Sequence, residues 1–128
     1  MKIRAREIGT FNCPPEIEPY LGQGQTFVTA GKEYEVQSIS LFNGIVSLQI
    51  VDDIDYPAWY PFVLFEIVEG SLPSDWQCRL FPNNDITGVT MILGPEFIVK
   101  DEAAYEAMVE LDPDQVDRFW KRVNAKSS

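Results

Sequence analysis

The chain has 128 residues, which is enough for one hydrophobic core and too few for two, so we expect a single domain over residues 1–128. Apolar residues make up 45% of the chain and aromatic residues 12%, a composition that excludes wholesale disorder. Twenty acidic and ten basic residues leave a formal net charge of −10, which disfavours binding to nucleic acid or to an anionic membrane and favours a basic partner. An acidic surface without any binding role is the alternative.

The chain contains no histidine, so it lacks the usual general base, the usual activator of a nucleophile and the commonest transition-metal ligand. Cys13 and Cys78 are far apart and form no CxxC motif, and either a disulfide or two reduced thiols fits them. The N-terminus has no apolar signal-peptide region, and no run reaches the roughly 18 apolar residues of a membrane span. We therefore predict no metal, no cofactor and no catalysis, and we expect a cytoplasmic protein.

Alternation of apolar and charged residues predicts a short or edge strand over residues 2–8, and prolines and glycines predict a turn-rich excursion over residues 12–25. Strands are then predicted over residues 33–42 and 45–51. Asn43 and the glycine after it form the favoured two-residue turn of a β-hairpin, because both residue types tolerate a positive φ. This hairpin is the clearest structural signal in the chain.

Further strands are predicted in the middle of the chain. Residues 58–68 predict another strand, interrupted by one helical turn at residues 61–64. Residues 76–81 and 88–93 are expected to pair as a second hairpin around the polar loop 82–87.

Two helices are predicted at the C-terminal end. Asp101 is a suitable N-cap for a helix that continues through Glu110. Asp112 and Pro113 mark the start of a second helix, where Gln115 has the spacing of a capping box. Apolar residues then recur on one face of that helix, which predicts a stripe facing the core: Val116, Phe119, Trp120 and Val123.

Strands that precede helices predict an α+β domain. The short strands and tight turns of about residues 1–93 favour a small, strongly bent antiparallel sheet or a barrel, completed by the second β-hairpin. Two C-terminal helices over about residues 95–124 are expected to pack against this β part.

The excess negative charge lies in the middle of the sequence, where residues 11–78 carry ten acids and a single base, Lys32. Asp52, Asp53 and Asp55 stand here at the end of a predicted strand. They lack the spacing and the mid-loop glycine of a calcium loop, and the chain has no phosphate-binding loop. A turn in which aspartates accept bonds from the nearby backbone explains the same residues, so no metal site is predicted.

Aromatic side chains follow these aspartates. Phe62 and Phe65 are predicted to lie in the core. Tyr56 and Trp59 stand beside acids and prolines, where rigid amphipathic rings are typical of interface anchors. Packing against proline to hold the turn is the alternative for both rings.

Three stretches, GKEYEV, VSLQIVDD and YPAWYPFVLFEIVEGSLPSDW, resemble segments of SH3-like barrels in small bacterial and phage proteins. Four stretches, SLPSDWQCRLF, ITGVTMILGPEFI, DEAAYEAMVELDP and RFWKRV, resemble proteins encoded among the immunity genes of bacterial polymorphic-toxin and contact-dependent inhibition systems. The resemblance covers about residues 31–123 and departs from the barrel pattern at Ile54 and Asp55, where a turn glycine is expected. It implies an SH3-like barrel and assigns no role to any single residue.

The resemblance implies a non-enzymatic immunity protein that binds and neutralises a cognate toxin domain. Because many such toxins are basic nucleases, an acidic inhibitor surface with aromatic anchors suits this function. The residues predicted to contact the toxin are acids and rings of the central stretch: Asp52, Asp53, Asp55, Tyr56, Trp59 and Glu69. A phage or host accessory protein, whose barrel binds another protein or copies of itself, is the alternative, and an enzyme that uses carboxylates alone is a third.

Overall fold

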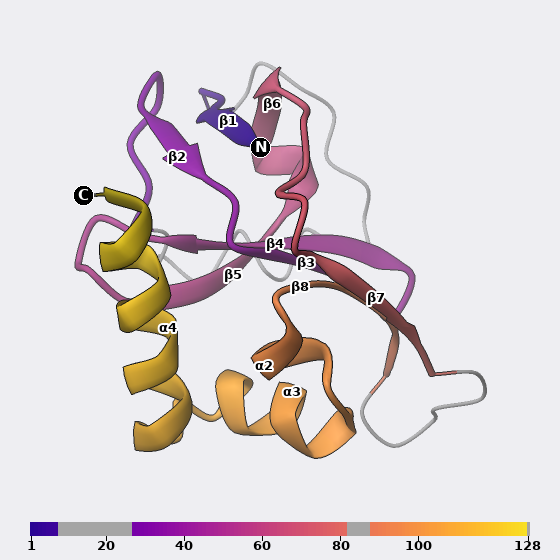
Figure 1. Cartoon of the computed structure of the whole chain (residues 1–128). Helices are drawn as coiled ribbons and strands as arrows, with labels where there is room; N and C mark the ends of the chain where they lie inside the picture. Colours follow the sequence, from indigo (N-terminus) through magenta and orange to yellow (C-terminus); the bar gives the residue numbers. More distant parts are fainter. Residues whose placement is uncertain (8–26, 82–87, 128) are drawn as a thin grey trace.

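The computed structural model describes residues 1–7, 27–81 and 88–127, and it has the predicted α+β architecture in three layers (Figure 1). A three-stranded sheet covers one face of a five-stranded sheet, and the helices cover the other face. The predicted turn-rich excursion at 12–25 and the predicted loop 82–87 lie outside the described residues.

Both sheets are antiparallel at every pairing in the described part of the chain. The small sheet has the order β2-β1-β6, with the strands β1 (Lys2–Ala5), β2 (Glu33–Glu35) and β6 (Phe65–Glu69). The large sheet has the order β5-β4-β3-β8-β7, with the strands β3 (Ser38–Phe42), β4 (Ile45–Val51), β5 (Pro57–Pro61), β7 (Gln77–Leu80) and β8 (Val89–Gly94). The first strand is short, as predicted, but it is the central strand of its sheet and not an edge.

The two predicted hairpins are confirmed. Phe42 of β3 lies opposite Ile45 of β4, and the two turn residues Asn43 and Gly44 have φ values of 50° and 77°. A two-residue turn with positive φ at both residues has a twist that matches the twist of the flanking strands. In the second hairpin, β7 pairs with β8 along four residues.

The described chain passes between the two sheets at three places, after β2, after β5 and after β6, and the first passage splits the predicted strand over residues 33–42. At the first, Val36 donates its N–H to the Met1 carbonyl and Gln37 donates to the Gln49 carbonyl, so β2 and β3 belong to different sheets. At the second, the predicted helical turn is a 3₁₀ turn, η1 (Phe62–Leu64), that leads from β5 into β6. The described strands therefore form two bent sheets and do not close into a barrel.

Two hydrophobic cores result, one on each face of the large sheet, so the expectation of a single core was wrong. The first lies between the sheets and contains residues of six strands, among them Ile3, Tyr34, Leu48, Ile50, Tyr60 and Phe65. The second lies under the helices and includes Val89, Ile92, Ile98, Met108 and Phe119. Phe65 is buried as predicted, whereas Phe62 is 37% exposed, because it opens the 3₁₀ turn at the surface.

In the described part of the chain the third layer has three helices, one more than the two predicted: the short α2 (Glu96–Val99), α3 (Glu102–Val109) and α4 (Pro113–Ser127). The Asp101 carboxylate caps α3 by accepting the N–H of Ala104 at 2.8 Å, as predicted. The predicted stripe of α4 packs on the second core, with Phe119 fully buried. Within the described part of the chain, no helix combines the length and the apolarity that crossing a membrane requires.

The capping-box role predicted for Gln115 is wrong. The side chain of Gln115 is buried, and its amide donates to the carbonyls of Phe97 at 2.9 Å and Ala104 at 3.0 Å. The N–H of Asp112, which a capping box would satisfy, instead donates to the carbonyl of Ala107. Gln115 therefore ties α4 to the two preceding helices.

Candidate functional site

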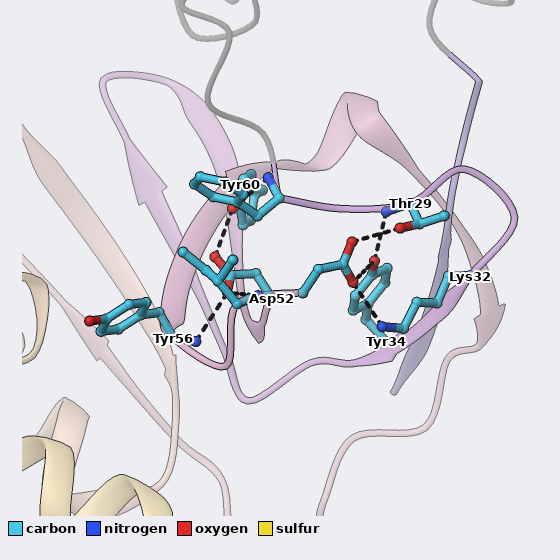
Figure 2. A network of polar contacts seen from close by, with 9 residues as sticks. Thr29, Lys32, Tyr34, Asp52, Tyr56 and Tyr60 are labelled. Carbon is cyan, nitrogen blue, oxygen red and sulfur yellow. Dashed lines mark hydrogen bonds and ion pairs between the residues drawn. The ribbon is translucent and has the colours of Figure 1, made fainter.

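The turn after β4 is built on the carboxylate of Asp52, which is only 5% exposed. One carboxylate oxygen accepts the N–H groups of Ile54 at 3.1 Å and Tyr56 at 3.0 Å, and the other accepts the Tyr60 hydroxyl at 3.0 Å (Figure 2). The main-chain N–H of Asp52 also donates to the carbonyl of Tyr56. The predicted strand-end turn is thereby confirmed, and the carboxylate of Asp52 is fully used by the fold. Burial raises the pKa of the Tyr60 hydroxyl to about 12.

Asp53 points to a different set of partners. Its carboxylate accepts hydrogen bonds from the Thr29 hydroxyl at 2.6 Å, from Lys32 Nζ at 2.8 Å and from the Tyr34 hydroxyl at 2.8 Å. Thr29, Lys32 and Tyr34 lie together on the far side of the Asp52 turn in Figure 2. Asp53 thus connects the turn after β4 to the segment that precedes β2. Its carboxylate is held by these three side chains and is not a free surface charge.

These bonds make the stability contribution of Asp53 dependent on pH. The hydrogen bonds from Lys32 and Thr29 lower the pKa of Asp53 below the ordinary aspartate value, and the bond to Asp53 raises the pKa of Lys32. A lowered carboxyl pKa contributes stability that is present above the unfolded pKa, about 3.9, and is lost as the pH falls through the folded value.

The variant Asp53→Asn is therefore expected to be less stable than the wild type at pH 7, with a difference that shrinks towards pH 3. Urea unfolding midpoints at the two pH values measure this difference. Glu35→Gln, which removes one exposed acid of β2 with the same change in net charge, is the control. A stability difference between the wild type and Asp53→Asn that is the same at both pH values would contradict the role of this ion pair.

Asp55 and Tyr56 differ from the two preceding aspartates because they face a groove. The groove has a volume of about 460 Å³ and lies between the β4–β5 turn and the α3–α4 corner. We name it the acidic groove and define it by its lining residues: Asp55, Tyr56, Pro57, Leu111, Pro113, Val116, Asp117 and Trp120. The Tyr56 side chain is 55% exposed and points away from the Asp52 network (Figure 2).

The helical wall of the acidic groove comes from a segment of the sequence that is rich in acids. Between Lys100 and Arg118 the chain has seven acids and no base: Asp101, Glu102, Glu106, Glu110, Asp112, Asp114 and Asp117. Four of these acids lie in residues 110–117, the segment that contributes most of this wall. Of these acids, Asp117 lines the groove together with Asp55, whereas Asp101, Asp112 and Asp114 line a different pocket beside Lys100 and Arg118.

Trp59 lies on the helix-facing side of β5 and is half-buried. Its ring meets the ring of Tyr105 of α3 edge-on, with centroids 5.6 Å apart. It also forms one wall of a smaller pocket of about 180 Å³, lined by Ser40, Phe42, Ile45, Ser47, Trp59, Pro61, Tyr105 and Val109. The side chain of Trp59 therefore packs mainly within the protein, in contrast to Tyr56.

Glu69 is exposed at the end of β6, in the small sheet, which is a different layer from the acidic groove. One oxygen of its carboxylate accepts the N–H of Ser71 at 2.7 Å, and the other lies 3.9 Å from the N-terminal ammonium group. The hydrogen bonds from Ser71 lower the pKa of Glu69.

Of the six residues predicted to contact a partner, the structure places Asp55 and Tyr56 together in one groove. Asp52 and Asp53 are engaged in the fold, Trp59 packs against α3, and Glu69 lies elsewhere. The sequence reasoning did not identify the helical wall of the acidic groove, which contains Leu111, Val116, Asp117 and Trp120. The run of seven acids without a base was a signal for an acidic segment, but that Asp117 alone among them shares the groove with Asp55 follows only from the fold.

The described residues offer no cluster of three or more cysteine, aspartate or glutamate side chains placed to hold a metal ion. Each of the three aspartates after β4 faces different neighbours, so their carboxylates do not converge. Comparison of the chain with protein-family models, with curated proteins and with solved structures yields no match.

Proposed function

We propose that the protein is a non-enzymatic, cytoplasmic binding protein of the immunity type, which neutralises a basic toxin domain by binding it through the acidic groove. The observation that carries this proposal is a groove with an exposed tyrosine and with one aspartate on each wall, Asp55 from the β4–β5 turn and Asp117 from α4. Because the toxins of such systems include basic nucleases, the proposed partner is a nuclease domain.

Charge and ring chemistry make distinct contributions to such binding. The acids of the groove attract a basic domain over several ångströms and raise the association rate, an effect that salt screens. Tyr56 and Trp120 supply rigid apolar area, which slows dissociation once water is excluded. An inhibitor of this kind needs no cofactor, because it only has to cover the active site or substrate channel of the toxin.

Co-expression with the protein encoded by the neighbouring gene tests the proposal. We expect the two proteins to co-purify, the toxicity of the neighbour to be suppressed, and the association rate to fall by about tenfold or more from 20 mM to 150 mM salt. Toxicity that persists despite equal expression would contradict the immunity function. An association rate independent of salt would contradict binding through an acidic surface.

A second candidate function is supported by the edge of the large sheet. All four residues of β7 are exposed, and Leu80 is 67% exposed. An exposed edge strand offers unpaired backbone groups to another strand, so an accessory protein that assembles with a partner or with its own copies is the alternative. A stable oligomer of the purified chain, with no effect on the neighbouring gene product, would favour this alternative.

A further inference from the structure

We propose that the acidic groove holds an arginine side chain of the bound protein, with its guanidinium group between the aromatic rings and carboxylates of the groove. This inference rests on the proposed function, because it names the group that a basic partner places in that site. Tyr56 and Asp55 come from the β4–β5 turn, whereas Trp120 and Asp117 come from α4. Aromatic and acidic side chains thus stand on both walls of the groove.

Both carboxylates are available to a cation. Within residues 1–7, 27–81 and 88–127, the side chain of Asp55 makes no hydrogen bond or ion pair, although its own N–H donates to the Asp52 carbonyl. Asp117 pairs with Lys121 at 3.0 Å, four residues further along α4, but both side chains of this pair are well exposed. Exposed pairs of this kind are weak, so an incoming cation can replace Lys121 with little loss.

The remaining walls of the groove favour arginine over lysine. Pro57, Pro113 and Val116 are apolar and suit the aliphatic stem of a long side chain. A guanidinium group is flat and weakly hydrated, so it stacks on aromatic rings and binds a carboxylate through two donors at once. The ammonium group of lysine is a compact and strongly hydrated point charge, which loses more on entering a site with apolar walls.

Leu111 adds apolar surface at this corner. It follows the end of α3 with a φ of 58°, and the N–H groups of Leu111 and Asp112 donate to the carbonyls of Met108 and Ala107. This helix ending normally has glycine at the residue with positive φ, because a side chain is strained there. Here the position is occupied by leucine, whose side chain is 40% exposed and lines the groove.

Peptide titrations test the inference without any toxin. The probes are acetyl-(Gly-Arg)₄-amide and two matched peptides in which lysine or the neutral isostere citrulline replaces arginine. We expect saturable binding of the arginine peptide at low salt, about fivefold weaker binding of the lysine peptide, and no binding of the citrulline peptide. Shifts of the Trp120 indole N–H resonance, assigned with the variant Trp120→Phe, report on occupation of the groove.

Variants locate the binding within the groove. Asp55→Asn, Asp117→Asn and Tyr56→Ala are each expected to weaken arginine-peptide binding by about threefold to tenfold. The control Glu35→Gln, which removes an exposed acid of the small sheet, is expected to leave the affinity within about twofold, because its charge is outside the groove. Equal binding of the arginine and lysine peptides, or equal losses for Asp55→Asn and Glu35→Gln, would overturn the inference.

Failure of the arginine site can be distinguished from failure of the proposed immunity function. If the protein suppresses toxicity and Asp55→Asn and Asp117→Asn bind the toxin as the wild type does, the arginine site is wrong and the immunity function stands. If the arginine peptide binds selectively in the groove but no neighbouring toxin is neutralised, the immunity function is wrong and the arginine site stands.

Discussion

Replacement of Asp52 by alanine is expected to lower the free energy of unfolding by about 3–5 kcal/mol, as measured by urea denaturation. The carboxylate of Asp52 is buried and accepts two backbone N–H groups of its own turn, and it also accepts the hydroxyl of Tyr60. In the alanine variant these three donors lose their acceptor inside the protein. Unpaired buried donors cost more than the hydrogen bonds contribute in the wild type, because they have been removed from water.

Asp55→Asn is the matched control for this prediction, because Asp55 lies in the same turn and its carboxylate accepts no bond from the described residues. Asparagine also tolerates the positive φ of 60° at this position. We expect a change of less than about 0.5 kcal/mol in the free energy of unfolding for this variant. A similar loss for Asp52→Ala and Asp55→Asn would mean that the turn does not depend on the Asp52 carboxylate.

Replacement of Phe119 by alanine is expected to lower the free energy of unfolding by about 3–5 kcal/mol and to abolish binding at the acidic groove. Phe119 is 1% exposed and anchors α4 in the second core, where its ring meets that of Trp120 at a centroid distance of 5.6 Å. Its removal leaves a cavity under the helix that carries Val116, Asp117 and Trp120, the α4 part of the groove wall. The free energy of unfolding and binding at the acidic groove therefore both depend on the Phe119 side chain.

Lys121→Ala, two residues further along α4, separates loss of packing from a general effect on the helix. Lys121 is largely exposed, and alanine favours the helix, so we expect a change of less than about 0.5 kcal/mol in stability. This variant also removes the ion pair with Asp117, so the arginine peptide is expected to bind it at least as tightly as it binds the wild type. Loss of peptide binding in Lys121→Ala with full stability would contradict the access of a cation to Asp117.

Local sequence signals predicted much of the fold because they act over a few residues. Asn43 and the glycine after it specify the first hairpin through their tolerance of positive φ, and Asp101 specifies the start of α3 through its side-chain bond to the helix backbone. The aspartate turn after β4 was predictable for the same reason, since the carboxylate of Asp52 bonds to amides two and four residues further on.

Long-range features were not predictable in this way. The strand pattern over residues 33–42 is continuous, but the chain changes sheets at Val36, where Met1 supplies the partner for its N–H. Likewise, the spacing of Gln115 predicted a local cap, but its amide bonds to α2 and α3 because their carbonyls lie within reach in the fold. In both cases a partner distant in sequence competes with the local one, and tertiary packing decides between them.

The same distinction applies to the candidate site. The sequence by itself determined the amount of acidic charge, the absence of histidine, and the aspartate turn that presents Tyr56. Only the tertiary structure decided which acids are available, because Asp52 and Asp53 are bound by Tyr60, Thr29 and Lys32 whereas Asp55 faces the groove. Packing of α4 on the second core placed Asp117 and Trp120 in the groove beside that turn. Charge is a property of composition, but a charged groove requires two distant segments to meet.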